Sequence, residues 1–172
     1  TSAGYTRYDT SEFRTAAVAR GIAVTNSSMV YTEPCAEHIL AFMLAQARLL
    51  PEGLQSRCDN TSSRWAYLRH ASRCLQHQSV FILGFGSIGA RLVELLAPFK
   101  MKITAVRRQA KGDEGVPIVS PDNIHAALAQ ADHVINILPD NAASRNFIST
   151  ERFGWMKPGA FFYNIGRGTT VD

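Results

Sequence analysis

The sequence predicts an α/β protein built on a doubly wound parallel sheet, and two observations carry this prediction. Short apolar or β-branched segments alternate with helix-like segments along most of the chain, a pattern typical of strand–helix–strand units. A glycine-rich turn also joins one apolar strand to a helix, at residues 84–89. With 172 residues, 46% of them hydrophobic and 19% charged, the chain can form one domain with a core, or a domain plus part of another.

The amino-terminal elements are predicted from helix caps and turn residues. Ser11 and Thr32 are expected to cap two helices, the first closed by Gly21 and the second stopped by Pro51–Gly53. The second helix is apolar on most faces, so it must be covered on more than one side. In chain order we expect a helix from Ser11, a strand over 21–26, a helix over 33–50, and a polar stretch over 55–78 with a loop at 59–65.

The remainder of the chain is expected to alternate strands with helices. Ser120 and Ser149 are predicted N-caps, and Pro121 stands at a first helical position. The predicted strands cover 80–83, 101–106, 116–119, 133–138 and 160–165, with helices over 87–99, 120–132 and 149–159 between them.

Composition and charge restrict the class of partner. Lys and Arg number 18 against 14 Asp and Glu, a formal net charge of +4, which favours anionic partners weakly, and no dense basic run indicates nucleic acid. No apolar run is long enough to span a membrane. Cys35, Cys58 and Cys74 are odd in number and lack CxxC spacing, so we expect reduced thiols, a cytoplasmic location and no metal site.

The segment "GFGSIG" places Gly84, Gly86 and Gly89 in a GxGxxG pattern. The pattern alone is weak, but here it follows an apolar strand and opens a helix, the context of a Rossmann-type dinucleotide site. The first glycine allows the tight turn, the second lets the backbone approach a pyrophosphate, and the third lets helix and strand pack closely. The N–H groups of Ser87 and Ile88 are expected to face the phosphates. A glycine-rich turn without a ligand is the alternative.

Arg107 and Arg108 follow the second strand, the first of them 18 residues after Gly89. A carboxylate at this place would accept the 2′-hydroxyl of NAD, whereas arginines pair with the 2′-phosphate of NADP. Charge alone therefore favours NADP(H) over NAD(H). Two alternatives remain, namely a solvated basic loop, or a ribose contact from Asp113 or Glu114.

Several motifs together resemble the D-isomer-specific 2-hydroxyacid dehydrogenases, over essentially the whole chain. "SAGYTRYD" is similar to the family's substrate loop and "TEPCAEHILAFMLA" to the helix that crosses between its domains. "FILGFGSIGARLVELLAPF" resembles the cofactor turn, and "MKPGAFFYNIGRGTTVD" the catalytic-arginine signature. The "VRRQ" segment is closest to the NADP-using glyoxylate/hydroxypyruvate reductases of the family. One departure is Lys100, where the family commonly has a glycine.

The resemblance implies an oxidoreductase that transfers a hydride between NAD(P)H and a small 2-oxo or D-2-hydroxy acid. Residues 1–30 would be the carboxyl-terminal part of a flavodoxin-like substrate domain, and residues 31–172 a Rossmann-type NAD(P)-binding domain, truncated before its end. Arg167 falls on the catalytic arginine, which binds the substrate carboxylate and polarises the carbonyl. The substrate carboxylate would also meet the N–H groups of Ala3 and Gly4. Further cofactor contacts are expected from Leu138, Pro139, Ile165 and Gly166.

The family also uses a catalytic histidine and a glutamate that tunes it, and both follow the "RGxxVD" motif. This chain reaches Asp172 at that motif, and none of its five histidines stands in a matching context. We therefore expect a fragment that binds a dinucleotide without turnover and that forms a homodimer through helix 33–50. For the parent protein the alternative is a non-catalytic dinucleotide-sensing module of the same fold. A formate dehydrogenase is favoured less.

Overall fold

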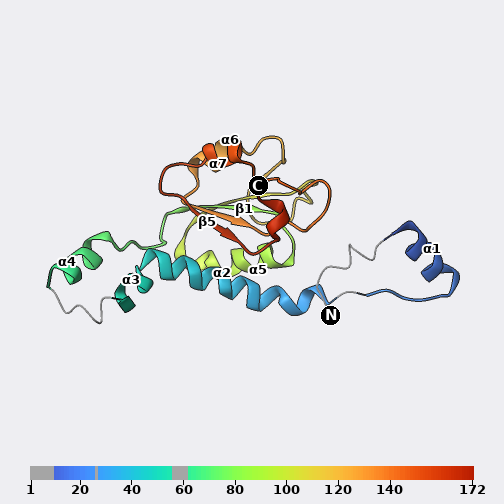
Figure 1. Cartoon of the computed structure of the whole chain (residues 1–172), viewed down its shortest axis with the longest axis horizontal. Helices are drawn as coiled ribbons and strands as arrows, with labels where there is room; N and C mark the ends of the chain where they lie inside the picture. The colour runs from blue at the N-terminus through green and yellow to red at the C-terminus, as the bar shows by residue number, and fades with distance from the viewer. Residues whose placement is uncertain (1–9, 26, 56–61) are drawn as a thin grey trace.

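The computed structural model describes residues 10–25, 27–55 and 62–172. Its body is one parallel sheet of five strands in the order β3-β2-β1-β4-β5 (Figure 1). The strands are β1 (Ser79–Leu83), β2 (Lys102–Val106), β3 (Ile118–Val119), β4 (His133–Asn136) and β5 (Phe161–Asn164). Each overlaps one predicted strand, and the prediction of a doubly wound parallel sheet is confirmed.

The strand order creates a switch point beside β1. The chain builds β1, β2 and β3 outward in one direction and then crosses to place β4 and β5 on the other side of β1. Leu83, at the end of β1, pairs in register with Val106 of β2 and Asn136 of β4. The carboxyl ends of these strands therefore lie side by side, and in a doubly wound sheet the ligand crevice forms at that place.

Helices cover both faces of the sheet. On one face lie α2 (Thr32–Ala47) and α5 (Ser87–Leu96), and on the other α6 (His125–Gln130) and α7 (Thr150–Gly154) (Figure 1). Successive strand residues point to opposite faces, so Ile82 joins the core beneath α2 and α5 while Phe81 joins the core beneath α6. The result is a three-layer α/β/α domain.

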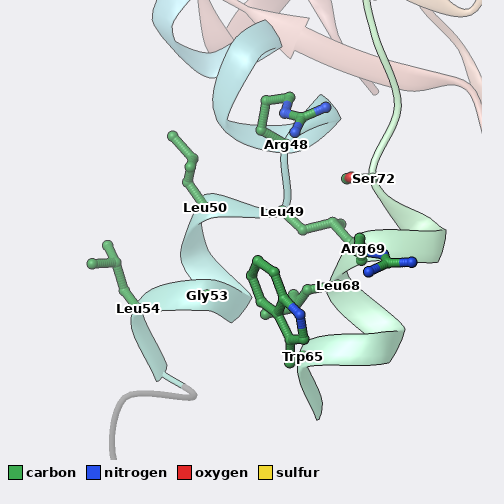
Figure 2. A pocket seen from close by; sticks show the side chains of 9 residues that line it. All are labelled: Arg48, Leu49, Leu50, Gly53, Leu54, Trp65, Leu68, Arg69 and Ser72. Atoms are coloured by element: carbon green, nitrogen blue, oxygen red, sulfur yellow. The ribbon is translucent and has the colours of Figure 1, made fainter. Parts of the chain in front are cut away.

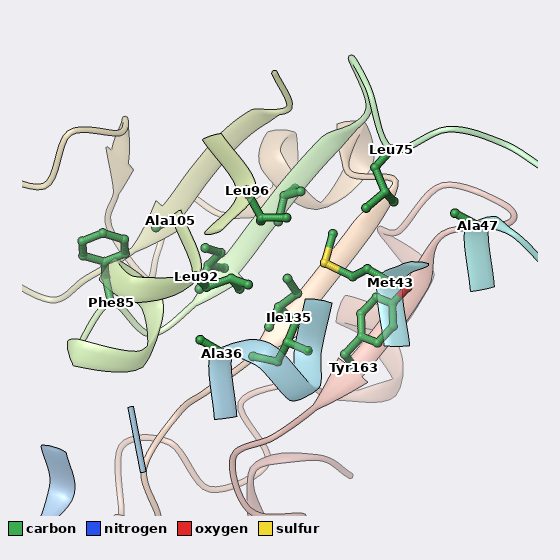
Figure 3. Close-up of a cluster of buried hydrophobic side chains, with 13 residues drawn as sticks. Ala36, Met43, Ala47, Leu75, Phe85, Leu92, Leu96, Ala105, Ile135 and Tyr163 are labelled. Atoms are coloured by element: carbon green, nitrogen blue, oxygen red, sulfur yellow. The ribbon is translucent and has the colours of Figure 1, made fainter. Parts of the chain in front are cut away.

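α2 packs against this body through one face. Its buried residues recur every three or four positions, the spacing of an amphipathic helix, and are Ala36, Ile39, Met43 and Ala47. Figure 3 shows this face against α5 and the sheet. Glu33 adds a two-bond ion pair to Arg91 of α5, with N–O distances of 2.6 and 2.8 Å. The other side of α2 is left exposed and includes Glu37, His38 and Phe42.

The first helix, α1 (Ser11–Ala19), is capped one residue earlier than predicted. The Thr10 side chain accepts a hydrogen bond from the Phe13 N–H, so Ser11 is the first helical residue and not the cap. Gly21 ends the segment with φ of +62°, as predicted. The predicted strand at 21–26 is wrong for residues 22–25, because they find no hydrogen-bonded neighbouring strand in the described part of the chain, and Asn26 lies outside that part.

The bounds of the second helix also differ from the prediction. Thr32 is the first residue of α2, not its cap, because the 3₁₀ turn η1 (Ser28–Tyr31) leads directly into it. α2 ends at Ala47, where the chain turns through a left-handed Leu49 (φ +51°). Pro51 does not stop a helix but lies in the first turn of α3 (Leu50–Gln55), where the lack of an N–H is tolerated.

Two later predictions need correction, while one cap is confirmed. The helix expected from Ser120 begins only at His125. Residues 120–123 instead form a turn, in which the Asn123 N–H donates to the Ser120 carbonyl at 3.1 Å. Part of the loop expected at 59–65 is helical, because residues 62–65 open α4 (Ser62–Ala71), and residues 59–61 lie outside the described residues. Ser149 caps α7 as predicted, its hydroxyl accepting from the Arg152 N–H.

Two parts of the chain extend away from the sheet. The α3–α4 hairpin lies at one end of the molecule and α1 at the other (Figure 1). Both expose large apolar side chains, among them Val18 (81% exposed), Leu54 (66%) and Trp65 (65%). Among the described residues, no helix is both long and apolar enough to cross a membrane.

Candidate functional site

Gly84 and Gly89 both lie where an added side chain would crowd neighbouring atoms. Gly84 follows β1 with φ of +96°, a conformation that side chains disfavour, and a Cβ there would lie 3.3 Å from the backbone of Ile137. A Cβ on Gly89 would lie 3.2 Å from the carbonyl oxygen of Gly84 and 3.3 Å from the ring of Phe85. Both glycines therefore allow the strand, the turn and α5 to pack closely.

Gly86 differs because nothing inside the described chain requires a glycine there. Its φ of −111° and ψ of −158° are extended values that other residues adopt, and a Cβ built on it would meet no atom within 4 Å. Gly86 is the N-cap of α5, and Ser87 and Ile88 are its first helical residues, whose N–H groups lack partners within the helix. Open space and available donors thus coincide at the crevice, and this arrangement fits an anionic pyrophosphate.

Arg107 and Arg108 both follow β2 directly, but their side chains differ in environment. The Arg107 guanidinium is partly buried and lies 3.4 Å from a carboxylate oxygen of Glu114. Arg108 is exposed and has no hydrogen bond or ion pair to another residue that the structure describes. Asp113 is likewise exposed. The two arginines carry the same charge, but the fold gives them different exposure and different partners.

The Glu114 carboxylate points into its own loop. It accepts hydrogen bonds from the N–H groups of Lys111 at 2.6 Å and Gly112 at 2.9 Å. These backbone donors, the Lys111 N–H above all, lower the pKa of the Glu114 carboxyl below its usual value. A ribose contact from Glu114, one of the alternatives left open by the sequence, is disfavoured because the Glu114 side chain is only 4% exposed.

The turn carrying Arg167 presses against the loop after β4. A Cβ on Gly166 would lie 2.7 Å from the carbonyl oxygen of Leu138, so only glycine allows this approach. The N–H groups of Ile165 and Gly166 both donate to the Asn136 carbonyl, at 3.0 and 2.9 Å. Leu138, half-buried, and Pro139, exposed, therefore lie beside the Arg167 turn.

Arg167 itself is exposed, between β5 and the 3₁₀ turn η4 (Gly168–Thr170). Its guanidinium donates to the carbonyl oxygen of Gly166 at 2.9 Å and has no ion pair with any residue that the structure describes. Its own carbonyl oxygen accepts from the Thr170 hydroxyl at 2.6 Å. The backbone of the turn is thus fixed, while the charged group remains available to an external carboxylate.

Asn136 and Thr170 were missed by the sequence reasoning. Both are fully buried, and the Asn136 side chain donates to the Thr170 hydroxyl at 2.7 Å and to the Asn164 side-chain oxygen at 3.1 Å. Its own side-chain oxygen accepts from the Leu138 N–H at 3.2 Å. The signal available was a lone asparagine inside the apolar run "HVINIL", because a buried amide must be hydrogen-bonded.

All five histidines lie among the residues that the structure describes. None of them hydrogen-bonds Arg167. His133 is buried at the amino end of β4, opposite the crevice, where its ring nitrogens meet Tyr163 Oη at 3.0 Å and Gln78 Oε1 at 2.6 Å. Burial lowers the pKa of His133 to about 4, so it is neutral at physiological pH. Its role is structural.

Some predicted residues and one cavity lie elsewhere. Ala3 and Gly4, expected to hold a substrate carboxylate, are outside the described residues, as is Cys58, while Cys35 and Cys74 are free thiols. A cavity of about 470 Å³ lies in the α3–α4 hairpin, lined by Leu49, Trp65, Leu68 and neighbouring residues (Figure 2). It belongs to the hairpin and not to the carboxyl edge of the sheet.

Comparison with known proteins places this site in a family. Residues 40–172 match the family described as D-isomer specific 2-hydroxyacid dehydrogenase, NAD binding domain. Over 98% of its length the chain is 30% identical to a glyoxylate reductase of Pyrococcus furiosus, covering 51% of that protein. Over 89% it is 30% identical to glyoxylate/hydroxypyruvate reductase B of Pectobacterium atrosepticum, covering 48%. The chain thus spans about half the length of these curated relatives.

Solved structures give the same result. Phosphoglycerate dehydrogenase from Lactobacillus plantarum superposes with a TM-score of 0.74 at 28% identity, over 99% of this chain and 53% of that one. D-mandelate dehydrogenase from Rhodotorula graminis reaches a TM-score of 0.82 at 18% identity, over 99% and 51% of the two chains, which supports the fold alone. The chain therefore belongs to the D-isomer-specific 2-hydroxyacid dehydrogenase family, and residues 40–172 correspond to its NAD-binding domain.

Proposed function

We propose that this chain is the cofactor-binding part of an NADPH-preferring oxidoreductase that interconverts a small 2-oxo acid and a D-2-hydroxy acid. The observation that carries the proposal is Gly86, a glycine that no internal contact requires, at the start of a helix in the switch-point crevice. Because no atom of the described chain fills the space beside Gly86, a ligand can approach the backbone closely there. The family membership supplies the class of ligand, a nicotinamide dinucleotide.

The proposed roles follow from position. Gly84, Gly86 and Gly89, with the N–H groups of Ser87 and Ile88, would hold the pyrophosphate. Leu138 and Pro139 would cover the cofactor, and Ile165 and Gly166 would lie toward its nicotinamide end, beside the Arg167 turn. When bound, nicotinamide supplies or accepts the hydride.

Arg167 is the proposed catalytic residue. Its exposed guanidinium has the geometry to hold a carboxylate by paired hydrogen bonds and to polarise the adjacent carbonyl. The fixed backbone of its turn would orient the acid. We propose that the N–H groups of Ala3 and Gly4 bind the other side of the same carboxylate.

Proton transfer requires a further group. None of the five histidines stands in a sequence context that matches the family's catalytic histidine. We therefore propose that residues 1–172 alone bind a dinucleotide without turnover, and that a histidine and a glutamate outside this sequence complete the site. Turnover by these 172 residues would contradict this part of the proposal. Binding without turnover in a longer product that carries such a pair would favour a dinucleotide-sensing module instead.

The proposed cofactor preference is for NADP(H), with glyoxylate and hydroxypyruvate as first substrates. Relatives named glyoxylate reductase and glyoxylate/hydroxypyruvate reductase support the choice of substrates. The exposed Arg108 and Lys111 in the loop after β2 support the cofactor preference. A fluorescence titration with NADPH and NADH tests it. Tighter NADPH binding is expected, and an Arg107–Arg108 double charge reversal is expected to abolish the difference. Equal affinities in the unaltered chain would contradict the preference.

The outlying segments suggest how the chain assembles. We propose that residues 1–30 belong to the substrate domain, because α1 lies apart from the sheet (Figure 1) and exposes the apolar Phe13 and Val18. We also propose a homodimer in the cytoplasm through the open face of α2 and the apolar α3–α4 hairpin. Light scattering is expected to show a dimer that Trp65→Ser dissociates. A monomer at micromolar concentration would contradict the assembly but not the cofactor site.

A further inference from the structure

The loop after β2 is closed by one buried acid. The Glu114 side chain is 4% exposed, against 27% for Arg107. Its two carboxylate oxygens take the N–H groups of Lys111 and Gly112, and one of them also lies 3.4 Å from the Arg107 guanidinium. Gly112 and Gly115 turn the chain with φ of +86° and +70°. Glu114 therefore joins the end of β2 to the far side of the loop.

The other charged side chains of the loop differ from Glu114 and Arg107 in exposure and pairing. Arg108, Lys111 and Asp113 are exposed, and their side chains have no hydrogen bond or ion pair to other described residues. The loop thus buries one acid against Arg107 and exposes two cations together with a single acid, Asp113. A charge that is already matched inside the loop is poorly placed to bind a ligand, whereas the unmatched Arg108 lies at the carboxyl end of β2, where the adenosine ribose binds in this fold.

From this arrangement we infer that Glu114 is a positioning residue for cofactor choice. It holds Arg107 in a contact within the loop and orders the loop backbone. Arg108, supported by Lys111, is thereby placed to bind the 2′-phosphate of NADPH. The inference rests on the proposed NADPH preference and deepens it. It also assigns different roles to the two adjacent arginines: Arg107 stabilises the loop, and Arg108 binds the ligand.

The inference predicts a change in NADPH affinity on removing Glu114 that is opposite to the change expected from charge alone. If Glu114 acted only through its charge, Glu114→Ala would remove a negative group near a dianionic phosphate and tighten NADPH binding. If Glu114 positions the loop, the same change frees Arg107, loosens the loop and weakens NADPH binding, because the ordering must then be supplied on binding. The 2′-hydroxyl of NADH needs no such cation, so its affinity should hardly change.

Asp113 offers the matched control. It is the neighbouring acid, and its removal changes the net charge of the loop by the same amount, but its exposed side chain holds nothing that the structure describes. Glu114→Ala is expected to raise the dissociation constant of NADPH about tenfold while that of NADH stays within about twofold. Asp113→Ala is expected to leave NADPH binding unchanged or slightly tighter. Glu114→Gln, which keeps one acceptor oxygen for the loop N–H groups, is expected to fall between.

The titrations use the whole chain, with NADPH and NADH as probes and thermal unfolding recorded for each variant. Tighter NADPH binding in Glu114→Ala, or a NADPH-to-NADH ratio no different from that of Asp113→Ala, would overturn the inference. If Glu114→Ala does not fold, Glu114→Gln decides by the same ratio. Absence of NADPH preference in the unaltered chain would instead contradict the proposed function, so the two failures are distinguishable.

Discussion

The side-chain amide of Asn136 donates to the hydroxyl of Thr170 at 2.7 Å, and this hydrogen bond joins the end of β4 to the turn that carries Arg167. The same hydroxyl donates to the Arg167 carbonyl oxygen at 2.6 Å. A buried relay through two polar side chains therefore fixes the backbone of the proposed catalytic arginine. The Arg167 side chain itself takes no part in the relay.

Replacing Thr170 by valine keeps the shape and removes both hydrogen bonds. We expect Thr170→Val to lower the free energy of unfolding by about 1–3 kcal/mol, since it leaves one N–H of the buried Asn136 amide without its acceptor. The Arg167 carbonyl loses the hydroxyl but keeps the Thr170 N–H at 3.1 Å. Urea unfolding measures the loss. Thr169→Val is the control, because the Thr169 side chain is exposed and, among the described residues, its hydroxyl bonds to the exposed Asp140 alone; its cost is expected to stay within about 0.5 kcal/mol. Equal costs for the two variants would contradict the relay.

The contact between Gly166 and Leu138 predicts a second asymmetry. An alanine at position 166 would place its Cβ 2.7 Å from a backbone oxygen, which cannot move as a flexible side chain can. Gly166→Ala is therefore expected to cost about 1–3 kcal/mol and to displace the turn of Arg167. Gly168→Ala, two residues away, meets no atom within 4 Å and has no positive φ, so denaturation should show a much smaller change. The opposite order would refute this account of the turn.

Much of this region was predictable, and the reason is physical. The glycines at 84–89 and the order of strands and helices follow from local patterns, because turn conformation and apolar periodicity are properties of short segments. The pairing of Arg107 with Glu114 and the burial of Asn136 were not predictable in the same way. Both depend on which residues the sheet and its loops bring together, and no spacing rule encodes that.

The wrong predictions have the same origin. Residues 22–25 have strand-like composition, but a strand exists only where a neighbouring strand pairs with it. Residues 62–64 are polar, yet they open α4, whose Trp65 and Leu68 help to line the cavity against α3 (Figure 2). In each segment a tertiary contact, present or lacking among the described residues, outweighed local propensity.

Lys100 predicts a gain in stability. It follows the 3₁₀ turn η3 (Ala97–Phe99) with φ of +52° and ψ of +40°, the left-handed conformation for which glycine is preferred. Glycine adopts this conformation without the steric cost of a Cβ. Lys100→Gly is expected to raise the free energy of unfolding by up to about 1 kcal/mol, whereas Lys100→Ala removes the same charge without relieving the backbone. Thermal melting should rank glycine above both lysine and alanine, and a destabilised glycine variant would count against this explanation.

His133 predicts a dependence of stability on pH. Because Gln78 Oε1 only accepts, the His133 Nε2–H donates to it and the Tyr163 hydroxyl donates to Nδ1, so the neutral ring fits the network. Burial lowers its pKa from 6.5 to about 4. The unfolded state therefore binds the proton first, and stability that is complete above about pH 6.5 is lost as the pH falls toward 4, by up to about 3 kcal/mol.

Unfolding curves between pH 4 and 8 measure this slope. His133→Gln is expected to be less stable at pH 7 but to show a flatter dependence between pH 4 and 6.5, since the titrating group is gone. An unchanged slope would assign the dependence to other groups.

The most direct test of the account is a calorimetric titration of NADPH into the chain and into its Gly86→Ala variant. Because a Cβ at position 86 meets nothing inside the protein, the free energy of unfolding is expected to change by less than about 1 kcal/mol. The methyl group would occupy the space in which the pyrophosphate approaches the backbone, so we expect binding at least about tenfold weaker, equivalent to about 1.4 kcal/mol. Equal NADPH affinity in both proteins, with both folded, would contradict the proposal that "GFGSIG" is a dinucleotide site.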